Sequence, residues 1–344
     1  MPLHQLPPEV LLHVLRLLGS VFFRQDTRRL LVSKWWYQLA WPVLLHDLAF
    51  SAASLRRFIL TFEREDVMSS MQNHPITTSL CLDGFQGWDA LWSDNSKPAR
   101  TNFEAVDAWT SELNGHLTSL VVILQRCAKL RSLTLKARPE HHDPRMDLQR
   151  RDYLMALPLA GLASISHLTC LEVDTAGTGL VNQSNAPGIH ICREIRSMLP
   201  TLRRLRCRMT SICPDVLDAP EKRPLLDLED VVVNLSLSEM SDSDTSYRYP
   251  SRCGHTYGGG FPQLKADMEA KAKDLAGRMR NPRIIRVVSH TLPGLKMHSF
   301  DALTGRRMLL PSATPWDADG EELEETVVGE EDFDSDSSSE EGLP

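Results

Sequence analysis

The sequence predicts an α/β protein with a small helical module in front, a parallel sheet behind it and a disordered acidic tail. Three observations predict this arrangement. A helical apolar run dominates the first fifty residues. A short apolar pattern then recurs, with helical stretches between its copies. The last part, from Trp316 on, is rich in Asp and Glu and contains no Lys or Arg. We therefore expect three parts: residues 4–50, 51–312 and 317–344.

The first helix is expected to begin at Leu6-Pro7-Pro8-Glu9. Proline fixes φ near the helical value, and its missing N–H would be unsatisfied in a first turn anyway. Apolar residues follow as far as Leu18, and Gly19 predicts the end of the helix. The run is apolar on more than one face, so part of it needs a partner or stays exposed. A second helix is expected over Thr27 to Trp41, ended or kinked by Pro42.

Over residues 4–50 the chain resembles the F-box family. The resemblance rests on Leu6-Pro7-Pro8-Glu9, on Leu12, Leu15 and Leu18, and on Leu31-Val32-Ser33-Lys34 with Trp36, Leu44 and Leu45. F-box modules are trihelical and bind the Skp-type adaptor of a cullin–RING ubiquitin ligase. The resemblance therefore implies this adaptor and, through it, cullin as partners. It also implies which side chains form or support the docking face: Leu6, Pro7, Pro8, Leu12, Leu15, Val32 and Trp36. The alternative is an ordinary helical hairpin that caps a larger domain.

The body repeats the pattern apolar-x-x-apolar-x-apolar, whose last positions suit a short half-buried strand. The copies are Leu130–Leu135, Leu168–Val173, Leu202–Cys207, Leu228–Val233 and Leu292–Met297, with a weaker one at Thr77–Leu82. The helical stretches between them are Leu117–Leu130, Asp152–Ile165, Ile189–Leu199 and Lys265–Met279. This alternation is typical of an irregular leucine-rich-repeat-like solenoid with one parallel sheet. A compact α/β domain whose strands merely look alike is the alternative.

The combination of an F-box with degenerate leucine-rich repeats is similar to a class of filamentous-fungal proteins. The segment Ser299–Leu310 resembles the end strand pair of such proteins, with its turn at Thr304-Gly305, and would shield the last open edge. A stretch near 238–262, rich in Ser, Asp, Tyr and Gly, predicts a mobile insertion. The acidic tail, 317–344, cannot bury a core and predicts a disordered, solubilising segment.

No residue pattern predicts a catalytic, cofactor or metal site. His141-His142-Asp143 has no second ligand pair at a zinc spacing, and Cys253-Gly254-His255 lacks a Cys-x-x-Cys partner. Cys192, Cys207 and Cys213 are interpreted as small buried hydrophobes. We therefore expect a protein that is not an enzyme, although an enzyme with a site in the α/β body remains a third hypothesis.

The composition argues against two classes of partner and favours a reducing compartment. The basic residues are scattered, which argues against a nucleic-acid module. No stretch of eighteen apolar residues exists, so no membrane span is expected. The lack of a secretory signal and the odd number of cysteines, seven, favour the cytosol or the nucleus.

These observations predict a substrate-recognition subunit of a Skp–cullin–F-box E3 ubiquitin ligase. The F-box would bind the adaptor, and the repeat body would bind an unknown target protein. The alternative is a leucine-rich-repeat scaffold that acts outside a ubiquitin ligase. Three arginines alternate onto one strand face and predict a patch for an acidic partner: Arg204, Arg206 and Arg208. A solvated face, or a dock for the chain's own acidic tail, would explain the same pattern.

Overall fold

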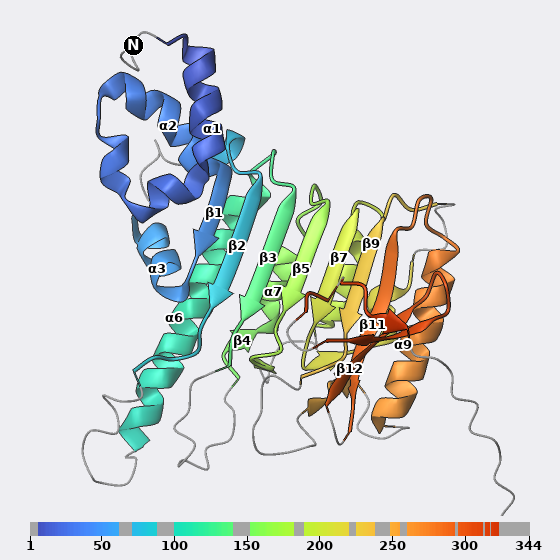
Figure 1. Ribbon diagram of the computed structural model, residues 1–344. Coiled ribbons are helices and arrows are strands. Elements are labelled where there is room, and N and C mark those ends of the chain that lie inside the picture. Colours follow the sequence, from blue (N-terminus) through green and yellow to red (C-terminus); the bar gives the residue numbers. More distant parts are fainter. Residues whose placement is uncertain are drawn as a thin grey trace, which may run out of the picture.

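A computed structural model describes residues 6–61, 71–87, 100–139, 152–181, 189–219, 225–237, 248–254, 260–292, 295–311, 314–316 and 318–322. Its framework is a ten-stranded sheet in the order β1-β2-β3-β5-β7-β9-β11-β12-β13-β14. Neighbouring strands are parallel from β1 to β11, and the last three join antiparallel. The protein is thus α/β, with a mostly parallel central sheet and helices at the N-terminus (Figure 1).

The parallel strands are β1 (Asp47–Phe50), β2 (Thr77–Leu82), β3 (Ser132–Ala137), β5 (Cys170–Asp174), β7 (Arg204–Arg208), β9 (Asp230–Asn234) and β11 (Ile284–Thr291). The antiparallel strands are β12 (Lys296–Asp301), β13 (Arg307–Leu310) and β14 (Glu321–Glu322). Two short parallel pairs lie outside this sheet: β4 (Leu154–Met155) with β6 (Leu180–Val181), and β8 (Ser211–Ile212) with β10 (Ser251–Arg252). The helices of the body are α3 (Ala52–Thr61), α6 (Arg100–Gln125), α7 (Ala156–Leu162), α8 (Ile191–Met198), η3 (Pro214–Leu217) and α9 (Gly260–Ala276).

Before the sheet, the chain forms a helical module from α1 (Pro8–Gln25), η2 (Thr27–Leu30) and α2 (Lys34–His46). The helix α1 continues beyond its expected end because Gly19 takes φ 74° and ψ 173°, a kink that glycine tolerates, and the helix then resumes. The helix α2 begins at Lys34 rather than Thr27, since the Ser33 hydroxyl accepts the Trp36 N–H at 3.1 Å and caps it. It also runs through Pro42, where the sequence predicted an end or a kink.

One backbone hydrogen bond recurs between the residues that directly precede successive parallel strands, and it gives the spacing of the strand repeat. It starts where the Ile76 N–H donates to the carbonyl of His46, the last residue of α2, at 2.9 Å. The following bonds run from Arg131 to Ile76, Thr169 to Arg131, Arg203 to Thr169, Glu229 to Arg203 and Arg283 to Glu229. The recurring bond therefore begins at the last residue of the helical module and continues along the sheet.

Two of the predicted strand copies are displaced from this repeat. The last two residues of the copy at Leu292–Met297 begin β12, whereas the strand equivalent to the other copies is β11. That strand was missed because Pro282 stands where the copies on β3, β5, β7 and β9 have Leu, ahead of the buried Ile285. At the other end, Leu80 pairs with Leu135 and not with Leu133, so the copy at Thr77–Leu82 is shifted by two residues. A two-residue shift keeps each side chain on its face of the sheet.

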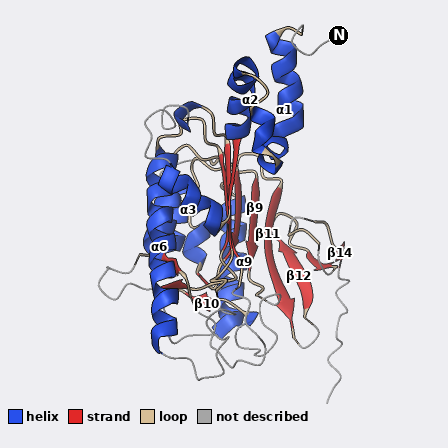
Figure 2. Cartoon of the chain, turned by 90° about the vertical axis from the view of Figure 1, so that its left-hand side faces the viewer, coloured by secondary structure: helices blue, strands red, loops and turns tan. Residues whose placement is uncertain are grey.

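The helices α3, α6 and α9 lie on one side of the parallel strands, and the antiparallel end of the sheet, with β12 and β14, lies on the other side of them (Figure 2). The main core fills the space between helices and sheet. Buried strand residues from Leu133 and Leu135 through to Ile285 and Val287 pack there against side chains such as Leu124. Among the described helices, none is long and apolar enough to cross a membrane.

At its C-terminal end, the chain covers the opposite face of the sheet. The strands β12 and β13 pair antiparallel, with Met297 opposite Leu310, and confirm the predicted end strand pair. Leu310 packs on Val232 and Val288, and Trp316 joins this second, smaller apolar cluster. Of the predicted mobile insertion, 238–247 and 255–259 lie outside the described residues, and 248–254 contains β10. Of the predicted disordered tail, 317 and 323–344 lie outside them, while 318–322 contains β14.

Candidate partner-binding face

The helix α1 has two apolar faces, and only one of them is used inside the module. Leu11 and Leu15 are 1% and 0% exposed and belong to a cluster that the rest of the module completes. Val10, Val14 and Leu17 follow one another at four- and three-residue spacing, so they share a neighbouring face of the helix. Their exposed fractions are 46%, 37% and 76%. Within the described part of the molecule, this stripe has no cover.

A second exposed apolar segment lies where the chain enters α2. Leu31 and Val32 are 75% and 70% exposed, and Trp35 is 38% exposed. The backbone is fixed on both sides of this segment. The Asp26 carboxylate accepts the Arg28 N–H at 3.0 Å, and Ser33 caps α2. The exposure of these side chains is therefore a property of a defined turn.

The predicted docking residues divide into exposed and supporting ones. Pro7, Pro8 and Val32 are exposed, and Leu6 and Leu12 are half-buried. Leu15 lies in the module core, so it can only support a docking face. Trp36 is half-buried, and its indole N–H donates to the Arg29 carbonyl at 2.7 Å.

Sequence reasoning did not name several exposed residues of this surface among the docking residues. These are Val10, Val14, Leu17, Leu31 and Trp35. The signal was available in part, because a helix that is apolar on more than one face must leave one of them outside its own core. Which face is left outside depends on where α2 packs, and that is a tertiary property.

The module is attached to the sheet through Asp47, the first residue of β1. Its carboxylate accepts hydrogen bonds from Ser20 at 3.2 Å and from Thr77, and the Arg24 guanidinium donates to its backbone carbonyl. Partial burial by itself raises the pKa of this carboxyl, but the bonds from Thr77 and His46 outweigh that effect and lower it. Asp47 is therefore a charged structural anchor between α1 and the sheet.

A hollow of about 630 Å³ lies beside this anchor, between the module and the entries of the first strands. Its walls include Leu12, Leu39 and Pro42, with Arg16 and Lys129 among the polar side chains. Ser20, His46 and Asp47 line it as well, and the Asp47 carboxylate is hydrogen-bonded to the Ser20 hydroxyl at 3.2 Å and lies 3.1 Å from the His46 Nδ1 atom. The polar groups of the hollow thus include those that anchor the module to the sheet.

The predicted arginine patch lies on β7, on the face of the sheet away from the main core: Arg204, Arg206 and Arg208. Arg206 stands in register with Glu172 of β5. Arg208 is 7% exposed and bonds to Asp174 through two parallel contacts, Nε to Oδ1 at 3.0 Å and Nη2 to Oδ2 at 2.7 Å. Its guanidinium lies 4.7 Å from the centre of the Trp316 ring. Arg208 is thus engaged within the chain.

The start of the acidic segment does contact arginines, but these lie on β11 and in the turn before β13. Asp319 pairs with Arg286 of β11, and Glu322 pairs with Arg306 at 3.0 Å. Residues 318–322 of the acidic tail therefore do contact arginines of the same chain, as one of the sequence-based alternatives expected, but at Arg286 and Arg306. Of the other candidates, His141, His142, Asp143 and His255 lie outside the described residues.

The chain was compared with models of protein families, with curated proteins and with solved structures, and nothing matches it. The geometry above and the sequence pattern therefore carry the functional argument.

Proposed function

We propose that this protein is a substrate-recognition subunit of a Skp–cullin–F-box ubiquitin ligase. In this proposal the helical module is an F-box that docks on the Skp-type adaptor. The sheet behind it is an irregular leucine-rich-repeat-like solenoid that holds a target protein. The chain would supply no acid, base or nucleophile, because the transfer chemistry belongs to other subunits.

The observation that carries the proposal is the uncovered apolar stripe on α1. Fully burying a Val or Leu side chain is worth about 1.5–3 kcal/mol, so three of them on one face leave a substantial free energy unused. A contiguous exposed apolar surface of this kind marks an interaction site. The stripe lies in the segment that resembles an F-box, and this favours the adaptor as its occupant.

The attachment of the module to the sheet supports a scaffold mechanism. The hydrogen bonds of Asp47 and the bond between Ile76 and His46 tie the module to the strand entries. A partner docked on α1 would therefore be held at a fixed position relative to the open face of the sheet. Holding a target lysine close to a conjugating enzyme raises its effective concentration and orients it.

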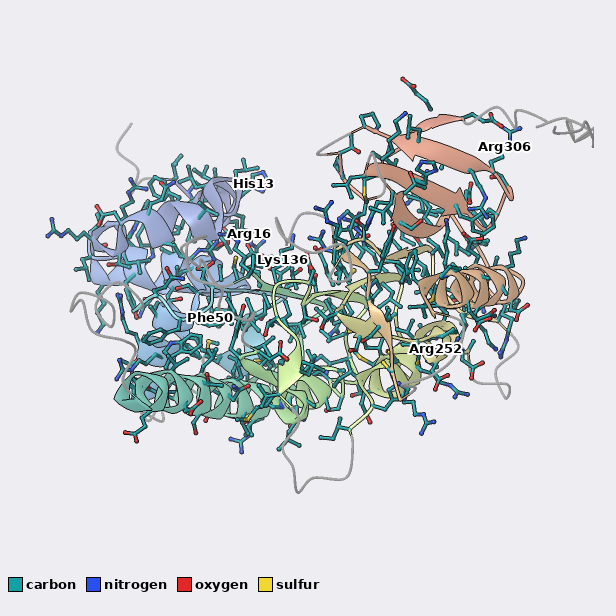
Figure 3. All side chains as sticks on the ribbon, turned by 90° about the horizontal axis from the view of Figure 1, so that it is seen from below. His13, Arg16, Phe50, Lys136, Arg252 and Arg306 are labelled. Atoms are coloured by element: carbon teal, nitrogen blue, oxygen red, sulfur yellow. The ribbon has the colours of Figure 1, made fainter. Side chains whose placement is uncertain are left out.

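The open face near β1 to β5 is the part of the body that best suits a target protein. Ser79 on β2 and Lys136 on β3 are exposed there, and Lys136 forms an ion pair with Glu172 at 3.0 Å. Further along, at β9 and β11, Leu310 and Trp316 cover the same face. Figure 3 shows Lys136 between the module with His13 at one end and the strands with Arg306 at the other.

The test is co-expression of the full chain with a Skp-type adaptor and its cullin, followed by affinity purification. We expect all three proteins to co-purify. Capture of the adaptor without cullin would favour the alternative, a scaffold that acts outside a ligase. A folded full chain, verified by circular dichroism, that captures no adaptor would contradict the proposal.

A further inference from the structure

Four side chains from three separate parts of the chain converge beside η3. They are His190, Cys192, Cys213 and Cys253, and their ligand atoms all lie within 4.8 Å of one another. Among the residues that the structure describes, this is the one group of this kind. The other four cysteines, Cys81, Cys127, Cys170 and Cys207, stand outside it.

The distances in this cluster lie close to those of a tetrahedral thiolate site. Zinc lies about 2.3 Å from sulfur and about 2.0–2.1 Å from imidazole nitrogen, which places two ligand sulfurs about 3.8 Å apart and a sulfur and a nitrogen about 3.6 Å apart. The Cys192 and Cys253 sulfurs are 3.8 Å apart. The Cys213 sulfur is 3.2 Å from the His190 Nε2 atom. A disulfide would need a sulfur–sulfur distance of about 2.05 Å.

Local structure explains how each ligand reaches the cluster. His190 and Cys192 flank the start of α8, and Cys213 stands directly before η3. Cys253 follows β10, which pairs with β8 and so brings residue 253 next to residue 213. Gly254 takes φ 75° and allows the chain to turn away after the ligand. The order His-x-Cys, Cys, Cys has no regular spacing, so no sequence motif reveals it.

The surroundings suit metal ligands. Cys192 and Cys213 are 0% and 5% exposed, so an ion bound there would be shielded from water. The Cys213 N–H donates to the Cys192 sulfur at 3.4 Å, a bond that steadies a thiolate. The second ring nitrogen of His190, Nδ1, lies 3.8 Å from the Asp215 carboxylate. A carboxylate on that side favours the tautomer in which Nε2 is free to bind metal.

We propose that His190, Cys192, Cys213 and Cys253 bind one Zn²⁺ ion in a closed, structural site. On binding, the three thiols release three protons to solvent, and Zn²⁺ with three thiolates and a neutral imidazole carries a net charge of −1. The Arg193 Nε lies 3.3 Å from the Asp215 carboxylate, so a cation stands beside this arrangement. Four protein ligands leave no open position, so the ion would be structural and not catalytic.

The site would fasten the segment around β10 to α8 and η3. Without the ion, the described part of this segment is held by the short β8–β10 pair, by an Arg252–Asp267 ion pair and by the stacking of Tyr249 on Phe261 and His290. The proposal is independent of the F-box assignment, because it concerns the opposite half of the sheet. It replaces the sequence-based interpretation of Cys192 and Cys213 as plain buried hydrophobes.

The experiment is a metal analysis of the full chain, purified without chelator and examined by plasma mass spectrometry. We expect about one zinc ion per chain. The Cys213→Ser and Cys253→Ser variants should lose it, whereas the matched variants Cys81→Ser and Cys170→Ser should keep it. Those control cysteines are half-buried and lie on β2 and β5, outside the cluster.

A second measurement does not depend on the folding of any variant. Native protein stripped of metal is titrated with Co²⁺, and a tetrahedral thiolate site gives intense ligand-field bands that saturate at one equivalent and disappear on addition of Zn²⁺. Folded native chain without zinc and without these bands would overturn the proposal. A Cys192–Cys253 disulfide in non-reducing peptide maps of the native chain would overturn it as well.

Discussion

The two ends of the sheet differ in whether the chain covers their apolar side chains. At the β1 end, the module has its own small core around Leu11 and Leu15, yet it leaves Val14 and Leu17 in water. At the β14 end, the chain folds back over its own sheet, and Trp316 and Leu310 cover what β9 and β11 would otherwise expose. Single exposed apolar side chains also occur in the body, such as Leu157 on α7 and Leu303 after β12. The comparison teaches that the module differs in presenting a stripe of them along one face of a helix.

Polar interactions also differ between the two ends of the sheet. At the β14 end, called the closed end because Leu310 and Trp316 cover its face, charged groups pair with each other, among them Arg208 with Asp174 and Arg286 with Asp319. The module end uses one carboxylate, Asp47, as an anchor to the sheet and exposes the apolar side chains Val14 and Leu17 beside charged ones such as Arg16. Substitutions in the buried charged pairs should therefore lower stability at the closed end, and substitutions in the exposed apolar stripe should affect binding at the module end.

The largest loss of stability is expected from Asp174→Ala at the closed end. The variant leaves the Arg208 guanidinium buried without its carboxylate, and breaking a buried pair in this way costs about 3–5 kcal/mol. Chemical denaturation monitored by circular dichroism measures the change. The exposed pair between Arg306 and Glu322 is the matched control, and Arg306→Ala should cost less than about 1 kcal/mol. Equal losses from the two substitutions would contradict this account of the closed end.

Leu15→Ala should destabilise the module by about 2–5 kcal/mol, because it opens a cavity in a core with few members. The module cluster is separate from the main core, so the loss should appear mainly in the module. Hydrogen exchange read by mass spectrometry can localise it. Faster exchange is expected over α1 and α2, with little change over β5 and β7. A uniform increase along the chain would show that the two ends unfold as one unit.

Acid should weaken the closed end through His290. Burial, with Arg248 nearby, lowers the pKa of His290 from 6.5 to about 4. Between those two values the unfolded chain binds a proton that the folded chain does not, so stability falls as the pH falls from about 6.5 to about 4, by at most about 1.4 kcal/mol per pH unit. Unfolding free energies of native protein and His290→Asn across this window test the effect. The variant should show the flatter curve, and parallel curves would exclude His290 as the cause.

Much of the fold follows from sequence pattern, and the exceptions have physical reasons. Alternation such as Leu133-x-Leu135 predicts strands that are buried on one face, and four copies fall on β3, β5, β7 and β9. The strand β11 was missed because Pro282 replaces the leading leucine. The register of β2 was missed because a shift of two residues leaves the buried face unchanged.

The candidate sites were less predictable than the fold. Leu15 and Leu17 look alike in the sequence, and only the packing of α2 decides that one is buried and the other exposed. The ligand cluster depends on strand pairing between β8 and β10, which brings together residues 213 and 253. Long-range pairing of this kind leaves no local pattern, so Cys192 and Cys213 looked like isolated hydrophobes and Cys253 like a ligand without a partner.

The most direct test of the central claim is the affinity of the full chain for a Skp-type adaptor, measured by titration calorimetry for native protein, Leu17→Asp and Leu157→Asp. Leu17 and Leu157 are both exposed leucines on helices, at 76% and 56%, but Leu157 lies on α7 in the body. Neither change should alter stability by more than about 0.5 kcal/mol. We expect native protein and Leu157→Asp to bind alike. Leu17→Asp should weaken binding by at least about 30-fold, the effect of losing an interface hot spot. Equal affinity of all three proteins, or no binding by native protein, would contradict the account.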